Sequence, residues 1–316
     1  MILRDAIDHY VTWRRAHGTR FVAPARALYQ FCRSVPENVS CDAVTEQEVR
    51  RFLAGTGPLT RWRAFKYSTL AGFYRYAVSR GYACRSPLPA ADEEPRQPQS
   101  KQSYIYSRSE LRRLFEAVDI SRKHAICLDS VTFRTIILIL YGTGLRSSEA
   151  LRLTMNDVDL ENAVLTVRNT KFYKSRLVPI ASRLGNALRG YAKQRSDRPL
   201  PEGMESSFFA NLDGTPVKQP NLQDAFRGLL ETTGIGRKDD GRRAPCLHAL
   251  RHTAAVHRLT SWYREGADLQ LLLPALSTYL GHVNLNGTSV YLSMTPELLH
   301  EASVRFDRYI NGGDHA

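Results

Sequence analysis

The stretch Ser277-Thr278-Tyr279-Leu280-Gly281-His282-Val283-Asn284-Leu285-Asn286-Gly287-Thr288-Ser289-Val290-Tyr291-Leu292 places an imidazole nine residues before a phenol. Its asparagine, glycine and threonine residues predict a turn that leads into a short helix. Three strings come earlier in the chain: Thr143-Gly144-Leu145-Arg146-Ser147-Ser148-Glu149, Thr170-Lys171-Phe172-Tyr173-Lys174-Ser175-Arg176-Leu177-Val178-Pro179, and His248-Ala249-Leu250-Arg251-His252. Within these strings, two guanidiniums, an ammonium, two imidazoles and a phenol come from the six residues Arg146, Arg251, Lys171, His248, His282 and Tyr291. Such a set can attack a phosphodiester without a metal ion.

The order of these strings resembles the tyrosine recombinase (phage integrase) family, and the resemblance covers nearly the whole chain. It implies a mainly α fold with one small antiparallel sheet, built as a two-domain C-clamp from a helical core-binding domain and an integrase-type catalytic domain. It also implies a site-specific DNA recombinase that cleaves and rejoins DNA through a 3′-phosphotyrosine intermediate, with no metal, ATP or other cofactor. The sequence contains no P-loop Gly-x-x-x-x-Gly-Lys-Ser/Thr, which agrees with an ATP-independent reaction.

The charge of the chain indicates a polyanionic partner. Its 316 residues include 44 Lys and Arg against 31 Asp and Glu, a formal net charge of +13. No acidic residue occurs between Glu48 and Asp92. Double-stranded DNA explains this better than a membrane surface, because there is no long basic amphipathic helix and no lipidation motif. We therefore predict a DNA-binding surface that includes Arg50, Arg51, Arg61, Arg63, Lys66 and Arg75.

Residues 1–90 are expected to form the helical core-binding domain. Thr45 and Glu48 have the spacing of a capping box, which predicts a helix to about Leu53. A longer helix follows Thr60, and its apolar stripe, expected to be core, consists of Trp62, Phe65, Leu70, Phe73 and Ala77. Prolines without hydrophobic periodicity predict a linker over residues 91–106.

Residues 107–316 are expected to form the catalytic domain. We predict a buried helix at Phe133–Leu140 and two strands, Val164–Val167 and Leu177–Ile180. The interval from Arg251 to His282 is longer than in compact family members, and a longer helix and loop over 262–276 would accommodate it. After Pro296 an apolar residue recurs every four positions, which predicts a C-terminal interaction helix that packs on its own domain or on a neighbouring protomer.

Arg146 and Arg251 are the candidates for binding the reacting phosphate. A guanidinium offers a planar fork to two phosphate oxygens and stays charged at any relevant pH. By the resemblance, both arginines stabilise the pentacoordinate phosphorane. Glu149 follows Arg146 by three residues and so shares its helix face. We expect this carboxylate to support the reaction by holding the guanidinium or capping backbone, not to take part in catalysis.

Lys171 is expected at the turn between the two predicted strands. By the resemblance, it protonates the departing 5′-oxygen, which an ammonium can do if its pKa falls toward neutrality. Lys174 is the alternative candidate for that role. Otherwise Lys174 contacts DNA phosphates together with Arg168 and Arg176.

The histidines allow a metal-site interpretation that we consider weak. His248 and His252 are four residues apart, but no glutamate lies between them and Arg251 would repel a cation. By the resemblance, His248 accepts or relays the tyrosine proton and His282 hydrogen-bonds the scissile phosphate, whereas His252 is expected to be structural. The chain has 15 tyrosines, and Tyr291 is the one that follows Leu-Gly-His at the spacing of the family nucleophile.

The resemblance implies a double-stranded DNA recombination site as partner and a homotetrameric synapse, formed alone or with related recombinases. Residues 277–292 resemble integrases of mobile elements, so integration, excision or transposition is the expected role. The alternatives are resolution of chromosome or plasmid dimers and a non-catalytic architectural protein that binds the site. Five cysteines without a Cys-x-x-Cys pair and no signal peptide predict a cytoplasmic protein of the bacterial nucleoid.

Overall fold

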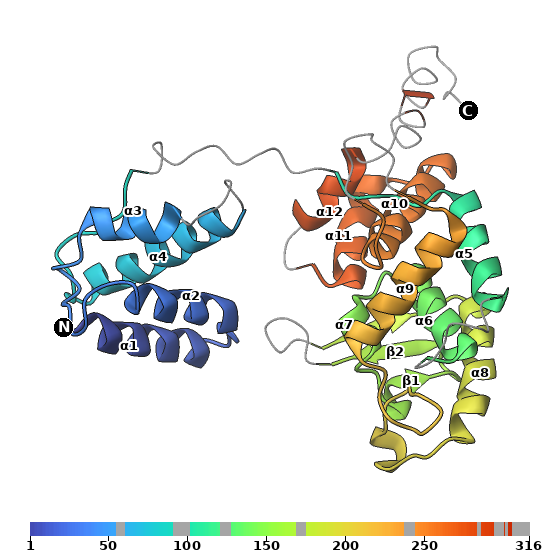
Figure 1. Cartoon of the computed structure of the whole chain (residues 1–316). Coiled ribbons are helices and arrows are strands. Elements are labelled where there is room, and N and C mark those ends of the chain that lie inside the picture. Colours follow the sequence, from blue (N-terminus) through green and yellow to red (C-terminus); the bar gives the residue numbers. More distant parts are fainter. Residues whose placement is uncertain are drawn as a thin grey trace. The chain divides into compact units, whose positions relative to one another are not determined.

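The computed structural model describes residues 1–54, 61–90, 102–120, 128–168, 175–236, 244–282, 286–293, 300 and 303–304. The chain divides into two compact units, Met1–Ser100 and Lys101–Ala316, drawn in blue to cyan and in green to red in Figure 1. The predicted fold class is confirmed, because the structure is mainly helical with one small antiparallel sheet. No helix in the described part of the chain is long and apolar enough to span a bilayer.

The N-terminal unit contains α1 (Leu3–Ala16), α2 (Val22–Cys32), α3 (Glu46–Ala54) and α4 (Arg61–Ser79). The predicted capping box opens α3: the Thr45 amide donates to Glu48 Oε2 at 2.8 Å, and the Glu48 amide donates to Thr45 Oγ1 at 3.3 Å. The core lies between the four helices, and its largest side chains are Tyr10, Phe31, Phe73 and Tyr74.

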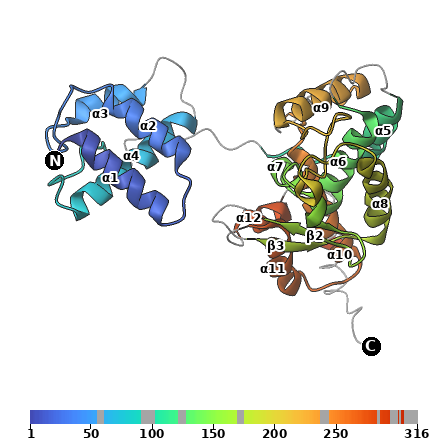
Figure 2. The same cartoon turned by 90° about the horizontal axis from the view of Figure 1, so that it is seen from below.

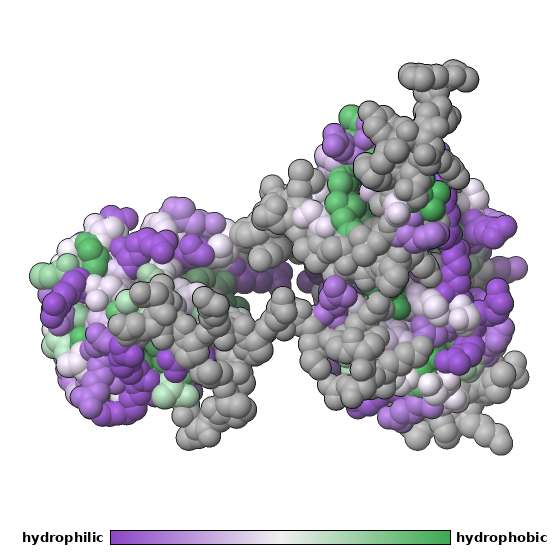
Figure 3. Space-filling view, turned by 90° about the horizontal axis from the view of Figure 1, so that it is seen from above, coloured by the Kyte–Doolittle hydropathy of each residue, from purple (hydrophilic) through white to green (hydrophobic). Residues whose placement is uncertain are grey.

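Trp62 does not belong to the core that the spacing predicts. Its side chain is 48% exposed and stacks on Phe65, with ring centroids 4.9 Å apart. Leu70, Phe73 and Ala77 of the same predicted stripe are buried. Among these residues the stripe is therefore core only in its C-terminal half. Hydrophilic side chains dominate the face of this unit drawn in Figure 3, which agrees with a solvated surface.

The second unit is built around α6 (Ser130–Thr143), the predicted buried helix. It packs against α5 (Arg108–Ile120), α8 (Ser182–Ser196) and α10 (Ala249–Arg264), while α9 (Gln219–Thr233) lies on α5. The side chain of Asp129 caps α6 by accepting a hydrogen bond from the Thr132 amide at 2.9 Å. Because α6 is surrounded, eight of its fourteen residues are buried.

The sheet has three antiparallel strands in the order β1 (Val158–Asp159), β2 (Val164–Val167) and β3 (Arg176–Pro179). β2 and β3 are the two predicted strands, and β1 is an addition. Val167 pairs with Arg176 at the end of the hairpin that leads to residues 169–174. Figure 2 shows β3 beside α11 (Leu269–Leu280), and the Tyr279 hydroxyl joins them by donating to the Pro179 carbonyl at 3.1 Å.

Short elements complete the unit: α7 (Ser147–Ala150), α12 (Asn286–Ser289), and the 3-10 turns η1 (Met155–Asp157), η2 (Gly203–Glu205) and η3 (Val290–Ser293). Of the residues predicted to form a turn after His282, Asn286, Gly287 and Thr288 instead form α12, with η3 following directly, and Asn284 lies outside the described residues. Residues 262–276 form the end of α10, a turn and the start of α11. Most of the predicted C-terminal interaction helix lies outside the described residues.

Candidate active site

Arg251 lies at the centre of the site and is 2% exposed. Its Nη1 donates to the Gly144 carbonyl at 2.6 Å and its Nη2 to the Leu280 carbonyl at 2.8 Å. These carbonyls end α6 and α11 and carry partial negative charge. Burial, followed by the nearby charge of Arg146, lowers the pKa of Arg251 to about 10, so the guanidinium stays charged at neutral pH.

Gly144 makes the turn that leads from α6 to Arg146. Its φ of 65° is left-handed, and a Cβ there would lie 2.6 Å from Leu280 Cδ2. Arg146 follows as the residue that caps α7. Its side chain is 36% exposed, and Nη2 lies 3.5 Å from the Gly281 carbonyl, to which it donates. The structure thus brings both predicted arginines to the C-terminal end of α11.

Glu149 holds Arg146 in place, as the sequence predicts for its supporting role. Its carboxylate is 3% exposed and accepts from Arg146 Nη1 at 2.8 Å and from the Arg146 amide at 3.0 Å. A second guanidinium donates to the same carboxylate, because Arg176 Nη2 lies 2.9 Å from Oε2. Burial would raise the pKa of Glu149, but the hydrogen bonds and charges of Arg176 and Arg146 lower it to about 2.

Arg176 differs from the expectation of a plain phosphate contact. Its side chain is 11% exposed and donates to Glu149 and, through Nε, to the Tyr279 carbonyl at 3.1 Å. It passes so close to Gly281 that a Cβ at that position would lie 2.6 Å from Nη1. Gly281 also has a φ of 72°. Arg176 is therefore a positioning residue that ties β3 to Glu149 and to the end of α11.

His282 follows Gly281 directly and is half-buried. Its Nδ1 lies 2.7 Å from the Thr288 hydroxyl, and its ring lies 6.0 Å from the Tyr291 ring. Burial, followed by the charges of Arg251 and Arg146, lowers the pKa of His282 to about 4. The imidazole is therefore neutral at pH 7 and can donate only one ring N–H.

Tyr291 lies in η3 and is 2% exposed. It packs in a small apolar cluster with Val256, Leu259 and Leu280. Burial raises the pKa of its hydroxyl, while the charge and hydrogen bond of Arg251 act in the opposite direction. The sequence candidates Tyr291, His282, Arg251 and Arg146 therefore gather at one place although they are up to 145 residues apart in the chain, from Arg146 to Tyr291.

His252 of the His248–His252 string lies beside the nucleophile candidate, and His248 lies beside His252. His248 precedes α10, and its ring contacts the ring of His252 at 4.8 Å. Nδ1 of His252 lies 3.2 Å from the Tyr291 hydroxyl. Sequence reasoning treated His252 as structural and missed this contact. The signal for it was the four-residue spacing that puts both imidazoles on one helix face.

Lys171 and Lys174 lie outside the described residues, between the paired ends of β2 and β3. Arg168 directly follows β2, and its Nε lies 2.6 Å from Asp157 Oδ1, a carboxylate that is almost fully buried. The Arg168 side chain is nonetheless 49% exposed. It can therefore keep this ion pair and still meet a phosphate, so its predicted contact stays a prediction.

Of the basic side chains predicted to form the DNA surface of the N-terminal unit, only some are fully exposed. Arg51 and Arg75 are exposed, Arg63 is half-buried, and exposed Arg50 pairs with Glu46 one turn earlier. The side chain of Arg61 lies outside the described residues.

Lys66 is wrongly predicted as a phosphate contact. It is 7% exposed, and its ammonium donates to the Phe52 carbonyl at 2.5 Å. The same nitrogen lies 4.5 Å from the Phe52 ring centroid. Burial lowers the pKa of Lys66, with Arg63 adding to the shift. The side chain joins α3 to α4 and has no open side toward a phosphate.

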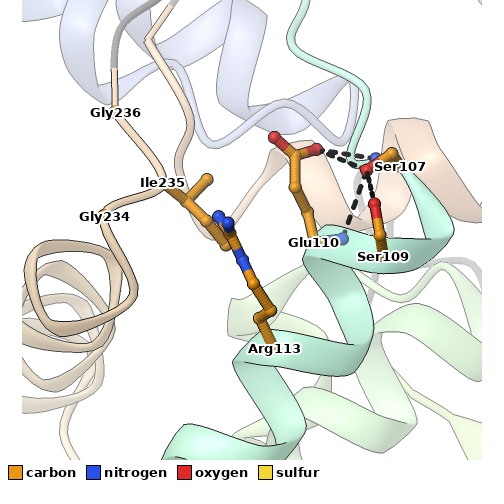
Figure 4. A pocket seen from close by; sticks show the side chains of 7 residues that line it. All are labelled: Ser107, Ser109, Glu110, Arg113, Gly234, Ile235 and Gly236. Carbon is orange, nitrogen blue, oxygen red and sulfur yellow. Dashed lines mark hydrogen bonds between the residues drawn. The ribbon is translucent and has the colours of Figure 1, made fainter.

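Two cavities in the described part of the second unit are lined by neither His282 nor Tyr291. One of about 380 Å³ lies between the start of α5 and residues 234–236, after α9 (Figure 4). Glu110, one of its polar lining residues, caps α5, since its Oε2 accepts from the Ser107 amide at 2.8 Å. Another, of about 290 Å³, is lined by Glu149, Asp157 and Arg168 among others. Its lining includes Glu149 of the site but neither His282 nor Tyr291.

Comparison with known proteins agrees with the geometry. Residues 107–297 match the Phage integrase family. The y4rE protein of Sinorhizobium fredii, named as an integrase/recombinase, is 34% identical over 98% of this chain and 97% of its own. Tyrosine recombinase XerA of Thermococcus kodakarensis is 31% identical over 80% of this chain and 84% of its own.

Among solved structures, the Tn1549 transposon integrase in complex with a circular intermediate DNA superposes with a TM-score of 0.72. It has 17% identity and covers 98% of this chain and 99% of its own. A lambda integrase dimer bound to a core site gives a TM-score of 0.64 with 17% identity, and the match covers 92% of this chain and 77% of the lambda integrase chain. These likenesses support the fold, and the sequence matches support the family. The chain belongs to the phage integrase family of tyrosine recombinases and is a site-specific recombinase.

Proposed function

We propose that this recombinase cleaves and rejoins DNA through a 3′-phosphotyrosyl bond to Tyr291, without metal or ATP. The observation that carries the proposal is the convergence of a buried phenol, two guanidiniums and a neutral imidazole. A tyrosyl phosphodiester keeps the energy of the broken DNA linkage, so a 5′-hydroxyl can reverse the step. No nucleotide is then needed to reseal the strand.

The contacts of the described residues support the following roles, and the role of Lys171 rests on the family resemblance. The Tyr291 oxygen attacks the phosphorus, and the bond to the 5′-oxygen breaks. Arg251 and Arg146 are held rigidly by the α6 and α11 carbonyls and by Glu149, so they can meet the charge that develops on the phosphate without reorganising. His282 donates its one N–H to a phosphate oxygen when Thr288 donates to Nδ1. Lys171 supplies the proton for the 5′-oxygen.

The partner that we propose is a double-stranded recombination site, bound by both units and brought together in a homotetrameric synapse. The N-terminal unit carries the acid-free basic stretch, in which Arg51 and Arg75 are exposed. Relatives of known structure are described in complex with DNA, among them XerH with its difH substrate and lambda integrase with a core site. The match over 98% of this chain to residues 82–397 of the Tn1549 transposon integrase favours movement of a mobile element over dimer resolution.

A nicked suicide duplex tests the proposal. The duplex is taken from the random sequences that the full-length chain binds, with a nick close to the cleavage position so that the cut fragment diffuses away. Wild-type protein should form an adduct that survives SDS, and a Tyr291→Phe variant should bind the duplex without forming it. An adduct with the phenylalanine variant would place the nucleophile elsewhere. A wild-type protein that binds but never forms the adduct would favour the architectural alternative.

A further inference from the structure

The Tyr291 hydroxyl needs a proton acceptor close to it. A phenol attacks phosphorus as the phenolate, and this phenol is 2% exposed, so bulk water does not reach it freely. Its burial also raises its pKa, which makes unaided ionisation less favourable. The side chain therefore depends on a neighbouring base within hydrogen-bond reach.

Two of its polar neighbours are poor acceptors. Arg251 is a cation, so it can donate to the hydroxyl oxygen but cannot accept its proton. His282 has its Nδ1 engaged with the Thr288 hydroxyl at 2.7 Å. Three arginines, Arg251 first among them, also disfavour a positive charge on His282. A proton placed on this imidazole would thus be held weakly.

His252 has the geometry that the others lack. Its Nδ1 lies 3.2 Å from the Tyr291 oxygen, and the two rings are 5.6 Å apart. It follows Arg251 in α10, so one helix delivers both the donor and the acceptor to the same hydroxyl. His252 is only partly buried and touches the ring of His248, which gives a proton a way out of the site.

We infer that His252 is a catalytic residue, the group that accepts the Tyr291 proton, an inference that rests on the proposed function. In this step the tyrosine oxygen forms its bond to phosphorus, its proton passes to Nδ1 of a neutral His252, and the 5′-oxygen leaves with a proton from Lys171. On rejoining, the imidazolium returns its proton to the tyrosine oxygen. Between cleavage and rejoining, His248 allows His252 to exchange its proton with solvent.

The asparagine variant His252→Asn tests this assignment. An asparagine amide oxygen occupies nearly the place of Nδ1 and can accept a hydrogen bond, but it cannot take the proton. We expect the single-turnover cleavage rate to fall by about 100-fold or more, in the range that loss of a general base produces. His257→Asn is the matched control, because His257 lies on the same helix and its Nδ1 makes a similar contact with the Tyr141 hydroxyl at 2.9 Å. This control should cleave at close to the wild-type rate.

A difluorotyrosine at position 291 separates proton acceptance from positioning. Fluorination makes the phenol more acidic, so it should restore much of the rate in the His252→Asn background and little in wild type. A His252→Asn protein that cleaves within about threefold of wild type would overturn the inference, and so would a defect that fluorination leaves unchanged. Neither result would touch the proposed function, which fails only if wild-type protein forms no adduct through Tyr291.

Discussion

Replacing Glu149 by glutamine should destabilise the catalytic unit by an amount that depends on pH. The carboxylate is 3% exposed and lies between the guanidiniums of Arg146 and Arg176. Its pKa falls from 4.5 to about 2 in the folded chain. One pKa unit corresponds to about 1.4 kcal/mol, so ionised Glu149 contributes about 3 kcal/mol at pH 7. Removing one partner of a buried ion pair costs a similar amount, about 3–5 kcal/mol.

The sign of the pH dependence follows from the direction of the shift. A depressed carboxyl pKa gives stability that is fully present above the unfolded value of 4.5 and is lost as the pH falls toward 2. The free energy of unfolding of wild type should therefore exceed that of the glutamine variant by about 3 kcal/mol at pH 7, but by only about 1 kcal/mol at pH 3. Below pH 3 the unfolding free energies of the two proteins should converge.

Urea unfolding followed by Trp262 fluorescence measures this difference in the second structural unit, which contains both Trp262 and Glu149. The other two tryptophans, Trp13 and Trp62, lie in the N-terminal unit and are replaced by phenylalanine in every protein compared. Glu161→Gln is the control, since Glu161 is exposed and should change the unfolding free energy by less than about 0.5 kcal/mol. A glutamine penalty at position 149 that is equally large at pH 7 and pH 3 would refute the reasoning.

Two further predictions concern DNA. Lys171→Ala should slow cleavage of an ordinary strand by about 100-fold or more yet cleave normally when sulfur replaces the bridging 5′-oxygen, because a thiolate leaves without a proton. If the sulfur substrate rescues Lys174→Ala instead, Lys174 is the acid. Arg51→Ala should lower the slope of log affinity against log salt by about 1, as expected for one lost phosphate contact. Lys66→Ala removes a buried ammonium, so it should leave that slope unchanged and lower the free energy of unfolding. A reduced slope for this variant would show that Lys66 reaches DNA.

Sequence patterns predicted the elements whose signals are local. The capping box at Thr45 and Glu48 needs only four residues, and the strand Val164–Val167 only its β-branched run next to a turn. The buried helix α6 follows from its apolar run Ile136–Leu140. The strand β1 has two residues, which is too short for any alternation to be visible, and it is defined by its pairing with β2. Such an element exists only because a neighbouring strand is already in place.

The roles of charged and polar side chains depend on contacts that no local pattern contains. Arg176 and Lys66 both lie in basic strings that look alike as phosphate contacts, yet packing turns each inward, toward Glu149 in one case and toward the Phe52 carbonyl in the other. A buried cation must find a carboxylate, a carbonyl or an aromatic face, and which of these is near is decided by elements far away in the chain. His252 shows the converse, because it gains a candidate chemical role from Tyr291, 39 residues later. Motif order thus predicts the groups that we propose to meet the phosphate, whereas the candidates for holding and deprotonating them become visible only when the helices are packed.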